Sequence, residues 1–455
     1  MAAQAQATLQ ARERAPLFSA DALRRLIIPL VVEQFLAMTI GMADTIMVTS
    51  VGEHAVSGVS LVDNISTLLI NVFSALATGG AVVAAQYLGS RDEENACSAA
   101  KQLFYAIATL SVATMAVCLL FREPILRLVF GHLDDNVMEA AMTYFLLTAI
   151  SYPLLAIYNA GAALFRAMGN SKVSMLASLL MNIVNIGLNA ILIYGVGIGV
   201  AGAGFGTLFS RLAGAVLMTW LICQSGHRIH IDHLLHFEFR GQLVKKILRI
   251  GVPNGLENGM FQIGKLLVLG LVTPLGTSAT AANAIANSVA GVVNVPGNAI
   301  SLSLITVVGQ CMGAGDSKQA VRYTRKLMII VYLAMGSLSV LLFFCAAPVV
   351  GLFGLTPGAA VMAIQVLRWC AVFDLIFWPM SFSLPNALRA SGDAKFTMIV
   401  SMCSMWIFRI GFSYLLVPQI GLLGVWVAMF IDWIVRAVVF LIRFLSGRWK
   451  TKTVI

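Results

Sequence analysis

The stretch LIIPLVVEQFLAMTIGMADTIMV, residues 26–48, decides the class of fold. It is long enough to cross a bilayer, because about 20 apolar residues in a helix span the hydrocarbon core. It nevertheless contains two carboxylates, Glu33 and Asp44. An ionised carboxylate is costly in hydrocarbon, so such residues face a protein interior or a water-filled path. The stretch therefore predicts a transmembrane helix that carries functional acids.

A second copy of this pattern, IGVPNGLENGMFQIGKLLVLG, occupies residues 250–270. Pro29 and Glu33 have counterparts in Pro253 and Glu257, whereas Asp44 falls opposite an apolar position near Val268. The chain is therefore predicted to consist of two related halves, with one carboxylate present in the first half alone.

Composition places the chain in the membrane. Of its 455 residues, 59% are hydrophobic and 11% are charged, whereas soluble domains average about 25% charged residues. The seven cysteines show no CxxC or Cys/His spacing. We interpret them as small buried hydrophobic residues, since neither a disulfide scaffold nor a zinc site fits this spacing.

Apolar runs predict twelve membrane-spanning helices. They lie near 26–48, 58–86, 97–120, 138–160, 173–195, 201–223, 247–272, 281–311, 324–347, 360–386, 396–417 and 421–445. Six spans per half is an even number, so both halves enter from the same side and form a parallel repeat. The expected fold is an all-α polytopic membrane protein with two six-helix lobes around a central cleft. The predicted segments are a tail (1–25), a first lobe (26–223), a linker (224–246), a second lobe (247–445) and a tail (446–455).

Lysine and arginine in the loops predict the topology. Nearly all loop cations fall on the side that holds both termini, and the opposite side has only Arg122 and Arg127. The positive-inside rule then places both termini in the cytoplasm of a prokaryote, with the chain in its plasma membrane. The net charge of +10 is explained by this topology and by attraction to anionic lipid, so we expect no nucleic-acid partner.

The linker has a histidine every third residue. These are His227, His230, His233 and His236. Asp232 and Glu238 are the only acidic residues that could complete a metal site there. We therefore favour a solvated or interfacial helix over a metal site.

The repeat extends well beyond the first span of each half. QYLGSRD at 86–92 matches QCMGAGD at 310–316, and LFRAMGNSK at 164–172 matches ALRASGDAK at 387–395. Together with ADTIMVTSVG and the run NIGLNAILIYGVGIGVAGAGFGT at 185–207, these motifs resemble the multidrug and toxic compound extrusion (MATE) family over the whole chain. The resemblance implies export of amphipathic, often cationic drugs by alternating access, driven by inward flow of H+ or Na+.

The resemblance also implies site residues. In one branch of the family the cation site of the N-terminal lobe maps onto Asp44, Asn185, Asn189 and Thr207. The sequence departs from that branch at Asn189, where the branch has an aspartate. In another branch the C-terminal lobe carries acids on spans 7 and 10, and here Glu257 and Asp374 lie on those spans about one helical turn from the expected positions.

The residues themselves support a coupling site in the first half. A partly desolvated Asp44 could exchange a proton or bind Na+, although a carboxylate at a helix end near water is the alternative. Asn182, Asn185 and Asn189 share one helix face, where they could solvate a cation or simply hydrogen-bond between helices. Asn64 and Asn71 are open to the same two interpretations.

In the second half, Asp374 precedes Trp378 and Pro379, an arrangement suited to binding an organic cation. Lys265 is a candidate charge neighbour of Glu257. The duplication of Glu33 and Glu257 favours a shared structural role, such as capping or contacts between lobes, as much as coupling. Glu257, Asp374 and Asn64 are therefore the candidates for a substrate site or a second coupling site.

Two further intramembrane charges have expected partners on spans 11 and 12. Asp432 and Arg436 are four residues apart and are predicted to pair with each other. Arg409 is expected to neutralise Asp374 or Glu257.

Two alternatives remain open. One is a flippase of the same broad superfamily that moves a lipid-linked sugar. The other is a membrane-embedded transferase, but the sequence has no Walker loop, HExxH motif or acidic metal cluster, so we expect no enzyme. The expected partners are small amphipathic or cationic molecules and the bilayer. The expected cofactors are none apart from H+ or Na+ as the coupling ion, and the expected assembly is a monomer.

Overall fold

The computed structural model describes residues 16–131, 134–234 and 236–455. The part of the predicted tail at residues 1–15, including Arg12 and Arg14, lies outside the described residues. Twelve helices in the described part are long and apolar enough to cross a membrane, which confirms the predicted number of spans. The helices of the first half are α2 (Ala20–Thr49), α3 (Glu53–Gly89), α4 (Glu93–Leu120), α6 (Asp135–Ala167), α7 (Ser171–Asn189) and α8 (Val200–Ile222).

The second half repeats this order. Its spans are α9 (Gly241–Val272), α10 (Thr277–Gly313), α11 (Ser317–Gly351), α12 (Pro357–Ile376), α14 (Ala394–Ser404) and α16 (Leu422–Leu445). Two of these spans continue through π turns, since α12 leads through Pro379–Ser383 into α13 (Leu384–Ser391), and α14 leads through Met405–Gly411 into α15 (Phe412–Ile420). A short helix, α5 (Arg122–Phe130), occupies a loop for which the sequence predicted no helix.

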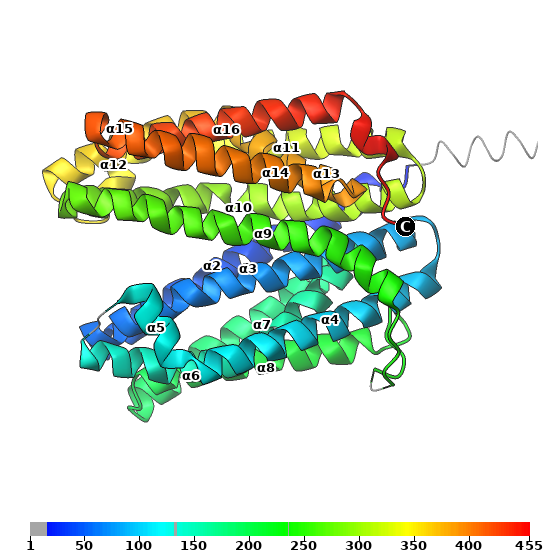
Figure 1. Ribbon diagram of the computed structural model, residues 1–455, viewed down its shortest axis with the longest axis horizontal. Coiled ribbons are helices and arrows are strands. Elements are labelled where there is room, and N and C mark those ends of the chain that lie inside the picture. Colours follow the sequence, from blue (N-terminus) through cyan, green and yellow to red (C-terminus); the bar gives the residue numbers. More distant parts are fainter. Residues whose placement is uncertain (1–15, 132–133, 235) are drawn as a thin grey trace, which may run out of the picture.

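The two halves form two bundles (Figure 1). One contains α2 to α8 and the other α9 to α16, and each has its own apolar core. Two helices cross this division. Leu23, Leu26 and Leu30 of α2 pack into the core of the second bundle, and Leu243, Ile247 and Ile250 of α9 pack into the core of the first. The bundles converge at the end that carries the C-terminus and spread apart at the opposite end (Figure 1). This confirms the predicted fold of two six-helix lobes.

Side chains of both bundles close the converging end. Gln86 on α3 donates a 2.8 Å hydrogen bond to the carbonyl of Ala390. Gln310 on α10 donates a 2.7 Å hydrogen bond to the carbonyl of Ala167. The backbone N–H of Val454 also donates to Gln86, so the end of the chain lies at the same junction.

Residues 224–234 and 236–240 of the linker are irregular, so the prediction of a helix over the histidines was wrong, and residues 241–246 already belong to α9. The backbone of the irregular part is instead fixed to α4, where Gln102 bonds the carbonyl of Glu238 (2.6 Å) and Tyr105 bonds the carbonyl of His236 (2.9 Å). His230 contacts Asp232 at 3.3 Å. Because backbone groups of the linker are satisfied by α4, the chain there has no need of helical hydrogen bonds.

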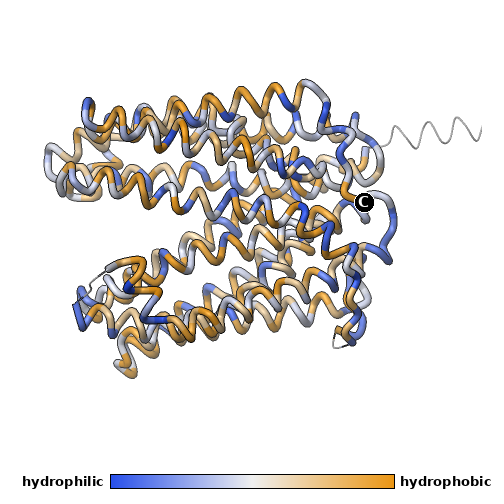
Figure 2. The backbone as a smooth tube through the Cα atoms, viewed as in Figure 1, coloured by the Kyte–Doolittle hydropathy of each residue, from blue (hydrophilic) through white to orange (hydrophobic). Residues whose placement is uncertain are grey.

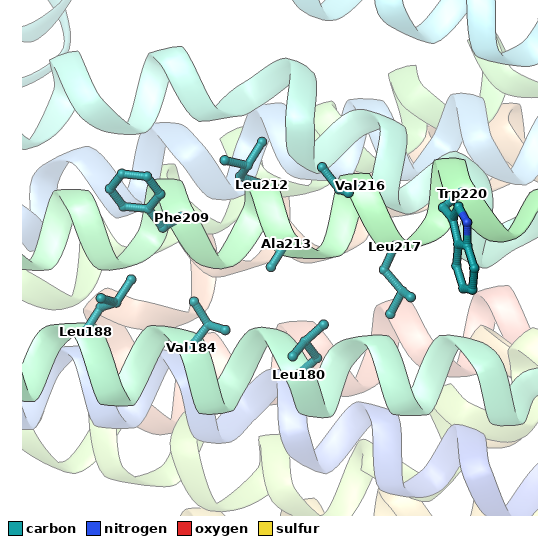
Figure 3. Close-up of a pocket in the computed structure, with 9 residues that line it drawn as sticks. All are labelled: Leu180, Val184, Leu188, Phe209, Leu212, Ala213, Val216, Leu217 and Trp220. Carbon is teal, nitrogen blue, oxygen red and sulfur yellow. The ribbon is translucent and has the colours of Figure 1, made fainter.

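Most residues along the spans are hydrophobic, and hydrophilic residues gather in the segments at the ends of the bundles (Figure 2). A groove of about 660 Å³ between α7 and α8 is lined by apolar side chains alone. Figure 3 shows Leu188 and Phe209 at one end of this groove and Trp220 at the other. Such a lining suits lipid acyl chains, so the functional groups must lie elsewhere.

Candidate functional site

Asp44 is held near the end of α2 by a residue of α7. Its side chain is buried, and Oδ1 accepts a 2.5 Å hydrogen bond from Nδ2 of Asn189. The same amide nitrogen lies 3.5 Å from the side-chain oxygen of Asn185. The structure therefore brings together three residues of the predicted cation-coupling set, and it removes Asp44 from the water-exposed helix end that was the alternative.

The asparagines of α7 form a buried polar face. Asn182, Asn185 and Asn189 are 4%, 1% and 0% exposed, as their helical spacing predicts. Asn189 is the last residue of α7, and the π turn Ala190–Gly195 follows directly. Such turns interrupt the regular backbone ladder and are frequent at functional sites.

Residues of α8 complete the same site. Gly206 packs against the amide oxygen of Asn189, and a Cβ at this glycine would collide with that oxygen. Thr207 follows it and is buried. Among the described residues, Oδ1 of Asn182, Oδ1 of Asn189 and Oγ1 of Thr207 have no hydrogen-bond partner. Buried oxygens are normally satisfied, so these atoms leave acceptor capacity for a cation.

The sequence interpretation overlooked Asp63 on α3, Tyr144 on α6 and Arg211 on α8. Tyr144 donates to Asp63 (Oη to Oδ1, 3.3 Å), and Asp63 interacts electrostatically with Asp44 and Arg211. Arg211 donates a 2.7 Å hydrogen bond to Ser151. The available signal was that Asp63 and Arg211 are charged residues within apolar spans, which marks functional candidates.

Asn64 and Asn71 on α3 have different surroundings. Asn64 is exposed and donates to the carbonyl of Ser60 on its own helix (2.9 Å). Asn71 also bonds its own helix and lines a cavity of the second lobe.

Glu33 and Glu257 form equivalent ion pairs. Glu33 contacts Arg166 at 2.9 Å, and Glu257 contacts Arg389 at 2.6 Å. Each pair lies within one lobe. It joins the first span of that lobe to the repeated motif that follows the fourth span of the same lobe. The shared structural role is therefore an ion pair within each lobe, and the suggestion of capping or contacts between lobes was wrong. The second charge near Glu257 is Arg436 at 3.6 Å rather than Lys265.

The expected pairing of Asp432 was also wrong. Its partner is Arg409, at 3.0 Å across helices, and Ser404 donates to the same carboxylate at 2.6 Å. Arg436 lies on the same helix as Asp432 but points to Glu257 and to Ser401. Arg409 thus neutralises Asp432 and not Asp374 or Glu257.

Asp374 is fully buried in the second lobe. Its Oδ2 accepts a 3.3 Å hydrogen bond from the thiol of Cys370, and Oδ1 has no partner among the described residues. The adjacent Phe373 stacks on Phe430 with 4.3 Å between ring centroids.

Two related bundles of six spans, each with buried charges in its interior, are the architecture of a membrane transporter. The family model MatE matches residues 29–191 and again residues 253–415. The chain therefore belongs to the MatE family, whose members are transporters, and the transferase alternative was wrong. The two matched segments also reproduce the internal repeat seen in the sequence.

Known proteins resemble the chain over almost its full length. It is 27% identical over 448 residues to the probable multidrug resistance protein NorM of Thermotoga maritima, covering 95% of this chain and 93% of that protein. It is 28% identical to the uncharacterized transporter YisQ of Bacillus subtilis, covering 93% and 94%. A solved outward-facing multidrug resistance MATE transporter has a TM-score of 0.88 at 23% identity, covering 95% and 96%, and shares the fold.

Proposed function

We propose that the protein exports amphipathic organic compounds, including cationic drugs, in exchange for H+ or Na+ moving inward. The observation that carries the proposal is the buried contact of Asp44 with Asn189, surrounded by amide and hydroxyl oxygens that have no partner in the described chain. Relatives named as probable multidrug resistance proteins support the class of substrate.

The coupling ion would be bound by Asp44. A carboxylate can take up one proton, or it can join amide and hydroxyl oxygens around Na+. The unpartnered hydroxyl of Thr207 is a candidate ligand for the second role. The amide nitrogen of Asn189 faces Asp44 and its oxygen packs against Gly206, so Asn189 would join the ligands after rotation of its amide. In either case the bound cation neutralises Asp44, while Asp63 and Arg211 set the surrounding charge.

Exchange requires that binding of the cation weakens binding of the substrate, and the reverse. We propose that neutralising Asp44 weakens the hydrogen bond from Asn189 and changes the packing of α2 against α7. A ligand can shift such an equilibrium only as far as it binds the two states differently. The cation and the substrate would therefore favour different arrangements of the first lobe.

The orientation follows from the loop charges. We propose that both termini are cytoplasmic, because the converging end carries the C-terminus, the first described residues before α2 and the basic loops (Figure 1). The spread end of the bundles would then face outward. We further propose a monomer, since each chain supplies both lobes of the repeat.

Transport by the purified protein in proteoliposomes tests the proposal. An inward-directed H+ gradient or Na+ gradient, each imposed alone, should drive movement of ethidium in the opposite direction, and the effective gradient identifies the ion. Movement that is equal with and without both gradients would refute exchange. Movement of a lipid-linked sugar without ethidium transport would favour the flippase.

A further inference from the structure

The cavity of the second lobe is basic and aromatic. It encloses about 610 Å³ between α9, α10, α12 and α16, with Asn71 contributed by α3 of the other lobe. Its cations are Lys265 and Arg409, and none of the described residues that line it is acidic. The cavity thus differs in charge from the site of the first lobe, where Asp44 and Asp63 gather.

Lys265 has no carboxylate partner among the described residues. The exposed side chain lies over the ring of Phe261, with 5.1 Å from Nζ to the ring centroid. Arg409 lies over the same ring, also at 5.1 Å, and its charge repels that of Lys265. A lone cation within a membrane span is costly and marks a ligand pathway by default.

The neighbouring carboxylates are already engaged. Asp432 is held by Arg409, and Glu257 is held by Arg389. Asp374 is fully buried against Cys370 and does not line the cavity. Among the described residues, no carboxylate therefore neutralises Lys265, and its ammonium group can pair with an anionic ligand.

The remaining lining suits a flat ligand body with polar substituents. Trp378 and Trp433 offer indole rings, which favour stacked or edge contacts with aromatic groups. Asn283, Asn287 and Asn294 follow α10 along the cavity and can donate or accept hydrogen bonds.

We propose that this cavity binds amphipathic aromatic compounds that carry an anionic group, with the anion at Lys265. The proposal rests on the proposed export function and adds anionic amphipathic compounds (carboxylates, sulfonates or phosphates) to its substrates, since the second lobe would bind them more tightly than organic cations. Arg409 remains paired to Asp432 and adds positive potential to the cavity. The tryptophans contact the aromatic part of the ligand.

Binding of three probes with one aromatic body tests the proposal. Pyrenebutyrate, its neutral amide and a pyrenebutyl trimethylammonium share the pyrene body and differ in their head group, which is anionic, neutral or cationic. Energy transfer from the cavity tryptophans reports binding to the purified full chain. The wild type should bind the carboxylate about tenfold more tightly than the ammonium probe, because a charged hydrogen bond is worth about that factor.

Variants assign the preference to Lys265. Lys265→Gln should remove most of the tenfold preference and leave affinity for the neutral amide unchanged, which shows that the cavity is intact. Lys265→Arg should retain the preference. Lys326→Gln is the matched control, because Lys326 is exposed on α11 away from the cavity. A wild type that favours the ammonium probe, or a preference that survives in Lys265→Gln, would overturn the proposal.

A transport measurement separates this inference from the proposed function. If the carboxylate preference depends on Lys265 but neither gradient drives export of any probe, the cavity assignment stands and the export function fails. If gradients drive export of the ammonium probe without a role for Lys265, the export function stands and the cavity assignment fails.

Discussion

Gln86 on α3 donates a 2.8 Å hydrogen bond to the backbone carbonyl of Ala390 in the opposite lobe. The second half of the chain returns the same contact, from Gln310 to Ala167. Both glutamines begin repeated motifs, and both carbonyls lie in the repeated loops. The internal repeat therefore closes one end of the molecule with a reciprocal pair of bonds between the lobes.

Removing both glutamine side chains should open this end. In Gln86→Ala with Gln310→Ala, two bonds between the lobes are lost, each worth about 1 kcal/mol. Spin labels at the exposed residues Glu94 and Lys318, one on each lobe, should show a longer distance distribution. Gln224→Ala is the control, since Gln224 lies at the same end outside these contacts. Unchanged distances in the double variant would contradict this role.

Breaking a buried ion pair should destabilise the second lobe. Glu257→Gln leaves Arg389 and Arg436 without their carboxylate, and an uncompensated buried charge costs roughly 3 kcal/mol. Thermal unfolding in detergent should show a clearly lower midpoint. Glu123→Gln breaks the exposed pair with Arg127 and should cost under about 1 kcal/mol. Equal shifts for the two variants would argue against the buried pair as a stabilising contact.

A methyl group at Gly206 should disturb the coupling site without changing its charge. Its Cβ would collide with the amide oxygen of Asn189, which would move the amide away from Asp44. Because that hydrogen bond stabilises the ionised carboxylate, its loss should strengthen cation binding by about tenfold, measured as the ion concentration that gives half-maximal transport. Gly187→Ala on α7 is the control, because a Cβ at Gly187 would meet nothing within 4 Å. Normal cation dependence in Gly206→Ala would contradict the arrangement.

The sequence allowed the fold to be predicted because length, apolarity and repetition act locally. A run of apolar residues is long enough to span a bilayer whatever its neighbours are, so all twelve spans could be recognised. The linker could not be predicted in this way. Its spacing of histidines suggested a helix, but contacts with Gln102 and Tyr105 on α4 determine its conformation.

The partners of intramembrane charges were harder to predict, because they depend on how helices face one another. Asp432 and Arg436 are correctly spaced for a pair on one helix, yet Arg409 from the preceding span lies closer to Asp432. The repeat identified Glu33 and Glu257 as equivalent, whereas their arginine partners became evident only in three dimensions.

The proposed coupling residues were predicted less completely than the spans but better than the charge partners. Helical spacing placed the asparagines of α7 on one face, and the position of Asp44 in an apolar span marked it as a candidate. The family resemblance then joined these residues in one predicted site. None of these signals indicated that Asp63 and Arg211 would lie near Asp44, because those residues are on other helices.

The central claim is that the carboxylate of Asp44 couples cation entry to export. Asp44→Asn keeps a side chain of the same size but cannot ionise, so it should abolish gradient-driven ethidium transport in proteoliposomes. The matched control is Asp135→Asn, at the exposed start of α6, which should transport normally.

Ethidium binding without a gradient should survive in Asp44→Asn, which shows that the protein is folded. The decisive quantity is the ratio of transport with the cation gradient to transport without it. The account predicts a high ratio for the wild type and a ratio near one for Asp44→Asn. A variant that retains the full wild-type ratio would contradict it.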